Sequence, residues 1–389
     1  MTATRQGYDG VVVTTPTSVP YQRFSTETAH WWAGAALRGL AEGSGISHRD
    51  MDGLSLASFG MAPDSAINFA QHAGMTVRHL DTVPLGGAAA TVSLRRAARA
   101  VQAGDADVVA CIGADTNTPD SFRAMLAGFS RFAQDAVYPV GAGGANASFA
   151  LLTRHYMQRF GATREDFARI CIAQRENALK NPRALMKKPL TLDAYMAARP
   201  VSDPVHLFDC VMPCAGAEAF LVMREETAKA QGIPFARVTG TIERHHAFPD
   251  DPVQIRGGWA QDVDDLYAMA GCTPSDIDVL QTYDDYPVIV MMQFEDLGFC
   301  AKGEGPAFVR SHDMRIAGDF PQNTSGGQLS AGQAGAAGGH LGLVEAIRQA
   351  TGTAGPTQVA DVKRAMALGF GMINYERGLA SAAVVLEAA

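Results

Sequence analysis

The polar stretch TYDDYP, residues 282–287, has residue types that could do chemistry. Tyr283 and Asp284 follow the apolar run IDVLQ, which predicts that they stand at the carboxyl end of a strand, where ligands collect in open α/β sheets. A tyrosinate there could take a proton from a substrate hydroxyl if its neighbours lowered the pKa of the phenol from about 10. The alternative is a tyrosine that only caps the strand. Asp284 or Asp285 could orient the tyrosine or a water, or simply form the turn.

A second stretch, residues 325–349, is rich in glycine and runs into an amphipathic helix. A segment this free of side chains lets a ligand or another backbone approach closely, and Gly326 and Gly327 open it. Its polar residues include Gln333 and His340. An amide can position a group or donate a hydrogen bond, but it has no useful pKa for proton transfer. His340 lies two turns beyond Gln333 and is predicted to point elsewhere.

Strands and helices alternate along the first part of the chain. The sequence predicts a strand over 10–15, a helix over 26–42, a strand over 51–58, a helix over 92–103 and a strand over 106–114. The last strand, ADVVACIGA, is apolar apart from Asp107 near its start, as expected for a strand that is covered on both faces. This alternation is typical of a layered α/β fold.

The later part of the chain repeats the earlier part. The segment CTPSDIDVLQT at 272–282 echoes ISHRDMDGLSL at 46–56, since each has a capped turn, an Asp-x-Asp and then a strand. Strands at 366–373 and 379–387 are predicted to pair as a terminal hairpin.

We therefore divide the chain into two similar α/β halves, residues 1–230 and 231–389. The segment from about 116 to 205 interrupts the first half, is rich in Arg, Lys and Met, and contains several helical runs. An insertion of this length usually serves as a cap or a binding region.

Composition excludes several classes of function. The 389 residues are 47% hydrophobic and 19% charged with a net charge of −8, and no long Lys/Arg run predicts a nucleic-acid partner. No apolar run approaches the roughly 20 residues that span a bilayer, and the first ten residues lack the apolar core of a secretory signal. The six cysteines show no CxxC spacing, so we expect no metal in this chain and a reduced, cytoplasmic setting.

Several longer stretches carry a resemblance to a known family. They are YMQRFGATREDFA, NPRALMKKPLTLDAY, RPVSDPVHLFDC, YDDYPVIVMMQFEDLGFCAKGEGPAFV and NTSGGQLSAG. With the doubled halves, they resemble the thiolase superfamily, and within it the sterol-carrier-protein-x or lipid-transfer type. The resemblance implies a thiolase fold of five layers, αβαβα, a homodimer and an acyl-CoA substrate, so that coenzyme A enters as part of the substrate.

The resemblance also implies which site residues to expect. Where the family has its nucleophilic cysteine, at the start of a helix in the first half, this chain has Gly87, whose free N–H groups could bind an oxyanion. Where the family has a histidine, this chain has Gln333. A branch of the family without the cysteine carries Tyr-Asp where Tyr283 and Asp284 stand. Those proteins are aldolases that cleave bulky β-hydroxyacyl-CoA side chains, as in steroid catabolism.

The sequence thus predicts a retro-aldol lyase in which Tyr283, Asp284 and Gln333 are catalytic, and leaves the second proton carrier unassigned. One alternative is a retro-Claisen thiolase acting on a bulky aromatic or steroid acyl-CoA, with Cys214 as a displaced nucleophile. A non-catalytic acyl-CoA-binding subunit is the other alternative. Buried cysteines are mostly inert, so Cys214 could instead only line the substrate site.

Other residues complete the predicted acyl-CoA site. Tyr375, near the place of a second catalytic cysteine in ordinary thiolases, is a reserve candidate for the missing acid. Arg183, Lys187 and Lys188 could meet the CoA phosphates, or could simply be solvated. The resemblance further implies a small OB-fold, zinc-ribbon partner protein that helps to hold the acyl-CoA, because this chain has no zinc-binding cysteine pattern of its own.

Overall fold

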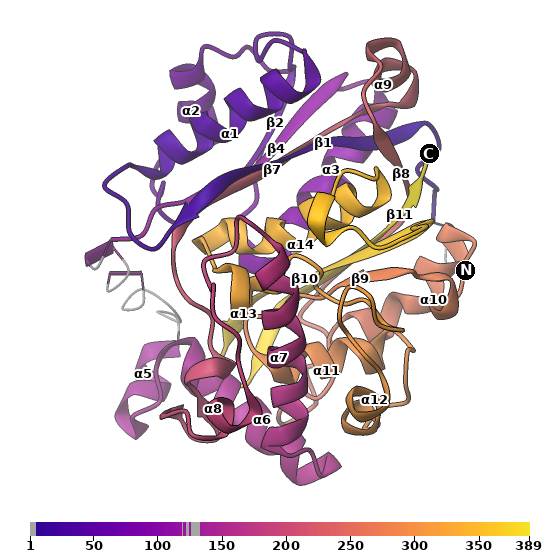
Figure 1. Ribbon diagram of the computed structural model, residues 1–389. Coiled ribbons are helices and arrows are strands. Elements are labelled where there is room, and N and C mark those ends of the chain that lie inside the picture. The colour runs from indigo at the N-terminus through magenta and orange to yellow at the C-terminus, as the bar shows by residue number, and fades with distance from the viewer. Residues whose placement is uncertain (1–4, 119, 122–123, 126–132) are drawn as a thin grey trace.

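A computed structural model describes residues 5–118, 120–121, 124–125 and 133–389. Its main feature is a nine-stranded sheet with the order β3-β2-β4-β7-β1-β8-β11-β10-β9 (Figure 1). The strands are β1 (Val11–Gln22), β2 (Gly53–Ala57), β3 (His79–Thr82), β4 (Val108–Asp115), β7 (Ala215–Arg224), β8 (Phe235–His245), β9 (Val279–Gln281), β10 (Arg364–Asn374) and β11 (Arg377–Ala388).

The sheet consists of two parts that meet at a narrow junction. The first five strands in the order come from residues 11–224, and the last four from residues 235–388. Only β1 and β8 join the parts, and they pair over three residues, Val12 to Thr14. The division of the chain into two similar halves near residue 230 stays a proposal.

Helices cover both faces of each part, in the order predicted for five layers. Helices α1 (Ala29–Ser44) and α2 (Ala66–Ala73) pack on the outside of the first part, with buried side chains such as Trp32, Leu40 and Phe69. Helices α3 (Ala89–Ala103) and α14 (Gly338–Ala350) lie between the two parts. Helices α10 (Trp259–Ala270) and α11 (Pro287–Asp296) cover the second part from outside (Figure 1).

The middle layer explains the apolar strand that the sequence predicts over 106–114. Strand β4 is buried along its whole length because α1 packs on one face and α3 on the other. Helix α3 begins earlier than predicted, at Ala89, because Gly86–Ala88 form a 3₁₀ turn that leads into it. Helix α1 begins later than predicted because Thr28 is its N-cap and accepts a hydrogen bond from Trp31.

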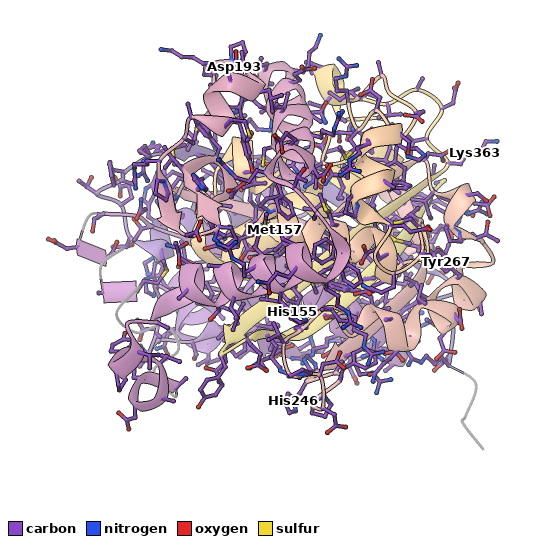
Figure 2. All side chains as sticks on the ribbon, turned by 90° about the horizontal axis from the view of Figure 1, so that it is seen from below. His155, Met157, Asp193, His246, Tyr267 and Lys363 are labelled. Carbon is purple, nitrogen blue, oxygen red and sulfur yellow. The ribbon has the colours of Figure 1, made fainter. Side chains whose placement is uncertain are left out.

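The predicted insertion is a helical unit below the sheet in Figure 1. Its helices are α5 (Gln134–Val137), α6 (Gly144–Phe160), α7 (Arg164–Lys180) and α8 (Leu192–Met196). A capping box between Thr163 and Asp166 starts α7, which packs on α11 and on α13 (Gly327–Ala331). Seen from below, α6 crosses the molecule with His155 and Met157 near the centre of the view (Figure 2). Residues 119, 122–123 and 126–132 of the predicted insertion lie outside the described residues.

The predicted terminal hairpin is confirmed, since β10 and β11 pair antiparallel from Arg364 with Glu387 to Asn374 with Arg377. Two further helices are α9 (Glu225–Gln231) and α12 (Gly305–Ser311). Among the described residues, no helix combines the length and the apolar character that crossing a bilayer requires.

Candidate active site

A cavity of about 1120 Å³ opens where the carboxyl ends of several strands meet the insertion. Such a place collects ligands in α/β proteins because loops and helix starts converge there. Its walls come from the loops that follow β2, β4 and β9, from the start of α3, from the insertion and from β10. Its lining residues include Phe59, Gly60, Gly86, Gly87, Asp115, Phe149, Arg199, Cys210, Cys214, Tyr283, Asp285, Tyr286, Gln333, Phe370 and Met372.

Gly87 and Tyr283 fit together inside this cavity. A Cβ atom on Gly87 would lie 2.0 Å from Cε2 of Tyr283 and 2.3 Å from the carbonyl oxygen of Phe370. Real Cβ atoms do not approach other atoms this closely, so position 87 accepts only glycine while the tyrosine ring is in place. The ring of Tyr283 therefore occupies the space into which a side chain at the start of α3 would project.

The backbone of Tyr283 is fixed by its place between β9 and α11. Its N–H group donates to Oε1 of Gln293 at 2.9 Å, and its carbonyl oxygen accepts from Nε2 of Gln293 at 2.7 Å. Pro287 then starts α11, where a residue without an N–H group is well tolerated. The expected position of Tyr283 at the end of a strand is thus confirmed.

The hydroxyl of Tyr283 meets three polar side chains. The side chains of Gln328, Gln333 and Asp285 lie close enough to it to shift its pKa or to be shifted by it. Burial, followed by the charges of Asp285 and Asp284, raises the pKa of Tyr283 well above its usual value. The condition under which Tyr283 could act as a tyrosinate, a pKa lowered by its neighbours, is therefore not met, and Tyr283 is a neutral phenol.

The two adjacent aspartates have different places. Asp284 accepts hydrogen bonds from the N–H groups of Gln328 at 3.0 Å and Leu329 at 3.3 Å, and it lies outside the lining of the large cavity. A Cβ atom on Gly327 would lie 2.1 Å from its Oδ2 atom. Asp284 therefore fastens the glycine-rich segment to the strand end, and Asp285 is the aspartate of this pair that lines the large cavity.

Burial raises the pKa of Asp284 to about 7. Burial, followed by the charge of Asp284, raises that of Asp285 well above its usual value. A buried carboxyl shifts in this direction because desolvation disfavours its charged form.

Gln333 lines the cavity, and its backbone is hydrogen-bonded to the segment before β7. Its N–H group donates to the carbonyl of Met212 at 2.9 Å, and its carbonyl accepts from the N–H group of Cys214 at 2.9 Å. Its side-chain amide donates to Oε1 of Gln328 at 3.2 Å. The structure therefore brings Gln333, Gln328 and Tyr283 together, and Gln328 is a polar neighbour that sequence reasoning missed.

Two cysteines line the cavity among the described residues, Cys210 and Cys214. Burial, followed by the charges of Asp209 and Asp285, raises the pKa of Cys210 to about 12. Burial also raises the pKa of Cys214. A thiol in such surroundings stays protonated and is a poor nucleophile.

Asp115 is a second cavity residue that the sequence reasoning missed. It accepts hydrogen bonds from the N–H groups of Phe59 at 3.1 Å, Gly60 at 2.6 Å and Ala336 at 2.7 Å, and from the hydroxyl of Ser58 at 2.8 Å. It thus ties the loop after β2 to the glycine-rich segment. Its position at the end of an apolar strand could have revealed it, as the same position revealed Tyr283.

Several predicted candidates lie apart from the cavity. His340 is buried in α14, where Nδ1 lies 3.3 Å from the carbonyl of Ala336 and burial lowers its pKa to about 4, so the prediction that it points elsewhere is confirmed. Tyr375 is 41% exposed on the β10–β11 turn and does not line the cavity. Gly326 packs against α7, since a Cβ atom there would lie 2.4 Å from that of Ala178.

The basic residues predicted for the CoA phosphates also lie outside the cavity lining. These residues are Arg183, Lys187 and Lys188. The ammonium group of Lys187 donates to backbone carbonyls of Asn181 and Pro182, at 3.4 and 2.9 Å. Arg199, in the insertion, is the one Arg or Lys side chain among the described lining residues.

The described residues hold no group of three or more His, Cys, Asp or Glu side chains that could bind a metal ion.

Comparisons with known proteins give several similarities. Residues 240–386 match the family model Thiolase C-terminal domain-like. The steroid side-chain-cleaving aldolase of Thermomonospora curvata is 32% identical over 335 residues, which cover 82% of this chain and 84% of the relative. The 17-hydroxy-3-oxo-4-pregnene-20-carboxyl-CoA lyase of Mycobacterium tuberculosis is 31% identical over 340 residues, with coverage of 82% and 86%.

Among solved structures, the Ltp2-ChsH2(DUF35) aldolase superposes with a TM-score of 0.85 and 27% identity, over 97% of this chain and 98% of the other.

Proposed function

The chain belongs to the thiolase superfamily, in its sterol-carrier-protein-like aldolase branch, and from this premise we propose that it is a lyase that cleaves a bulky β-hydroxyacyl-CoA by a retro-aldol reaction. One observation carries the proposal. The place beside α3 into which a nucleophilic side chain would project is filled by the ring of Tyr283, against the bare Cα atom of Gly87. A hydroxyl that can exchange protons thus stands where the resemblance puts a thiolate.

The reaction follows from the chemistry of a β-hydroxy thioester. A base takes the proton of the β-hydroxyl group, the bond between Cα and Cβ breaks, and Cβ becomes a carbonyl. The electron pair of the broken bond forms the enolate of the shorter acyl-CoA, which is then protonated at Cα. The site must therefore handle one proton and stabilise one oxyanion.

We assign the contact with the β-hydroxyl group to Tyr283. We propose the backbone N–H group of Gly87, which lines the cavity, as a hydrogen-bond donor to the thioester oxygen. The side-chain amide of Gln333 faces the phenol and positions it. Asp284, with Gly326 and Gly327, acts by holding the glycine-rich segment in place. Tyr375 has no role in this scheme.

The size and walls of the cavity suit a bulky acyl group. Its volume of about 1120 Å³ slightly exceeds the roughly 300–1,000 Å³ of ordinary small-molecule pockets. Phe59, Phe149, Phe370 and Met372 supply apolar surface. The charge of Arg199 suits a phosphate of the CoA moiety, so we assign this role to Arg199 in place of Arg183, Lys187 and Lys188.

The alternative thiolase reaction needs a thiolate. Cys214 is the candidate at the cavity, but burial raises its pKa and keeps it as a thiol. The non-catalytic alternative needs no buried acids at the cavity, whereas Tyr283 and Asp285 both line it.

We also propose that the chain works in the cytoplasm in a degradation pathway, as a homodimer beside a small OB-fold, zinc-ribbon protein. The name of the Ltp2-ChsH2(DUF35) structure, which joins two proteins, supports the partner. The dimer is supported by β3, which is at the edge of the sheet and has Leu80 39% exposed. Light scattering of the purified chain, with Leu80→Lys as the variant, tests the dimer.

The activity is tested with 17-hydroxy-3-oxo-4-pregnene-20-carboxyl-CoA, the compound in the name of the mycobacterial relative. Mass spectrometry should find one ketone and one shorter acyl-CoA, and the reaction should proceed when no free CoA is added. A thiolase reaction would consume free CoA and give two thioesters. Failure to cleave this and other bulky β-hydroxyacyl-CoA compounds, with the partner protein present, would contradict the lyase function.

A further inference from the structure

We propose that Asp285 is the second proton carrier of this site, receiving through Tyr283 the proton that leaves the substrate and returning it to the product. The role rests on the proposed lyase function, for which the sequence left the second carrier unassigned. Sequence reasoning placed Asp284, and not Asp285, among the catalytic residues. The contacts of the two carboxyl groups separate their roles.

The carboxyl of Asp285 lines the same cavity as Tyr283 and is incompletely bonded. The hydroxyl of Tyr283, its own N–H group and that of Tyr286, at the start of α11, lie near it and lower its pKa. Its Oδ1 atom is covered, yet has no hydrogen-bond partner among the described residues. A carboxyl oxygen with no donor is unusual in a protein interior and leaves a place for a proton.

The other two aspartates at this end of the sheet serve as controls within the molecule. Asp115 accepts three backbone N–H groups and a hydroxyl, and Asp284 accepts the N–H groups of Gln328 and Leu329. Both tie separate segments of chain together. Asp285 ties no distant segment, since its backbone partners lie within its own turn.

The neighbours of the Tyr283 hydroxyl favour a proton that points toward Asp285. The amides of Gln328 and Gln333 lower the pKa of Tyr283, as hydrogen bonds donated to the phenol oxygen do. The hydroxyl proton is then free to point at the carboxyl group. Tyr283 and Asp285 thus form a path along which a proton can move from the cavity to the phenol and then to the carboxyl group.

The electrostatic setting of Asp285 suits a base. Burial, followed by the charge of Asp284, raises its pKa, and a carboxylate with a raised pKa accepts a proton more readily than a solvated one. The titratable or charged groups that face it are Tyr283, Asp284, Tyr286 and Cys210, and Arg199 lines the same cavity.

The step balances without a co-reactant. As the oxygen of Tyr283 takes the β-hydroxyl proton, the tyrosine passes its own proton to Asp285. The bond between Cα and Cβ breaks to give the carbonyl product and the enolate. Asp285 then returns its proton, again through Tyr283, to Cα of the enolate. One proton has moved from oxygen to carbon.

The test compares Asp285→Asn, which keeps the shape and removes the base, with Asp285→Glu and with Asp264→Asn on the exposed face of α10. The first readout is kcat for cleavage as a function of pH. The second uses propionyl-CoA, the shorter acyl-CoA that retro-aldol cleavage of the test substrate would release. Exchange of its α-protons for deuterium in D₂O is measured by mass spectrometry. This exchange is the reverse of the final protonation and needs no β-hydroxy substrate.

We expect Asp285→Asn to lower both rates about 10²- to 10⁴-fold, with KM changed by less than about threefold. The wild-type kcat should rise with pH as Asp285 ionises, and this rise should be absent from the residual activity of Asp285→Asn. Asp285→Glu should recover part of both rates, and Asp264→Asn should match the wild type.

Two results would overturn the role in distinguishable ways. If the wild type cleaves and exchanges and Asp285→Asn does so within threefold, Tyr283 works with another carrier, while the lyase function stands. If the wild type neither cleaves nor exchanges, the lyase function itself fails. Equal melting temperatures for wild type and Asp285→Asn exclude loss of the fold as the cause of a lower rate.

Discussion

The two turns that follow β2 and β9 occupy matching places in the two parts of the sheet. Each leaves the carboxyl end of a strand that pairs in parallel with a neighbour, and each follows one of the two echoed segments. The first turn, residues 58–60, contributes Phe59 and Gly60 to the cavity and no titratable side chain. The second contributes Tyr283 and Asp285. One half of the molecule supplies the wall at this point, and the other supplies the groups that can exchange protons.

The comparison is sharpest at Tyr283, where we expect the largest effect. Tyr283→Phe keeps the ring that fills the space beside Gly87 and removes only the hydroxyl. The cleavage rate should fall about 10²- to 10⁴-fold, equivalent to about 3 to 5 kcal/mol in the activation barrier. Gln333→Ala should cost less, because an amide cannot transfer a proton at neutral pH. Single-turnover kinetics of both variants would measure this order, and a Phe variant as fast as the wild type would place the chemistry outside the second turn.

The pH dependence of stability sharpens the comparison at Asp284. Its pKa of about 7 lies above its usual value, so the folded chain binds more protons than the unfolded chain between about pH 4 and 7. The free energy of unfolding should therefore fall as the pH rises through this window, by up to about 4 kcal/mol from this one group. In Asp284→Asn the fall should be smaller by that amount.

Urea unfolding at several pH values would measure this pH dependence of the free energy of unfolding. Asp276→Asn is a suitable control because Thr273 holds the pKa of Asp276 below its usual value, so its contribution is lost only at lower pH. Equal slopes for wild type and Asp284→Asn would mean that Asp284 is charged throughout.

The contact between the halves can be broken at Gly87. Gly87→Ala places a methyl group against Tyr283 and the carbonyl of Phe370, which should lower stability by about 1 to 3 kcal/mol and displace the ring. Adding Tyr283→Ala makes room, so the cost of the alanine at position 87 should be smaller in that background. Gly34→Ala in α1, where a Cβ atom meets nothing within 4 Å, is the matched control. Additive effects at 87 and 283 would contradict the close fit.

The smallest effect is expected at the two cavity cysteines. Cys210→Ser and Cys214→Ala should each leave kcat within about threefold of the wild type, because burial keeps both thiols protonated. Intact-mass measurement during turnover should find no acyl adduct on the protein. An acyl adduct on Cys214 would instead identify this cysteine, in the segment before β7, as the nucleophile.

More of the fold than of the candidate site could be predicted from the sequence. The alternation of elements, the apolar β4 and the terminal hairpin all follow from patterns that span several residues. The choice between Asp284 and Asp285 could not be made, because adjacent residues in a turn face different ways and only the packing of the glycine-rich segment decides which one meets it. The sequence also could not show whether the pKa of Tyr283 is lowered, because burial outweighs the effect of the two amides and the burial of one turn cannot be inferred from its local sequence.

The close fit of Gly87 and Tyr283 has a consequence for how such a chain can change over generations. A cysteine at position 87 would meet the tyrosine ring, and a smaller residue at position 283 alone would leave neither a thiolate nor a phenol. Each single-residue step away from the present pair therefore passes through a damaged protein. In evolutionary terms the two positions are epistatic, and a route to acyl transfer through a cysteine at position 87 requires both to change before either change is useful.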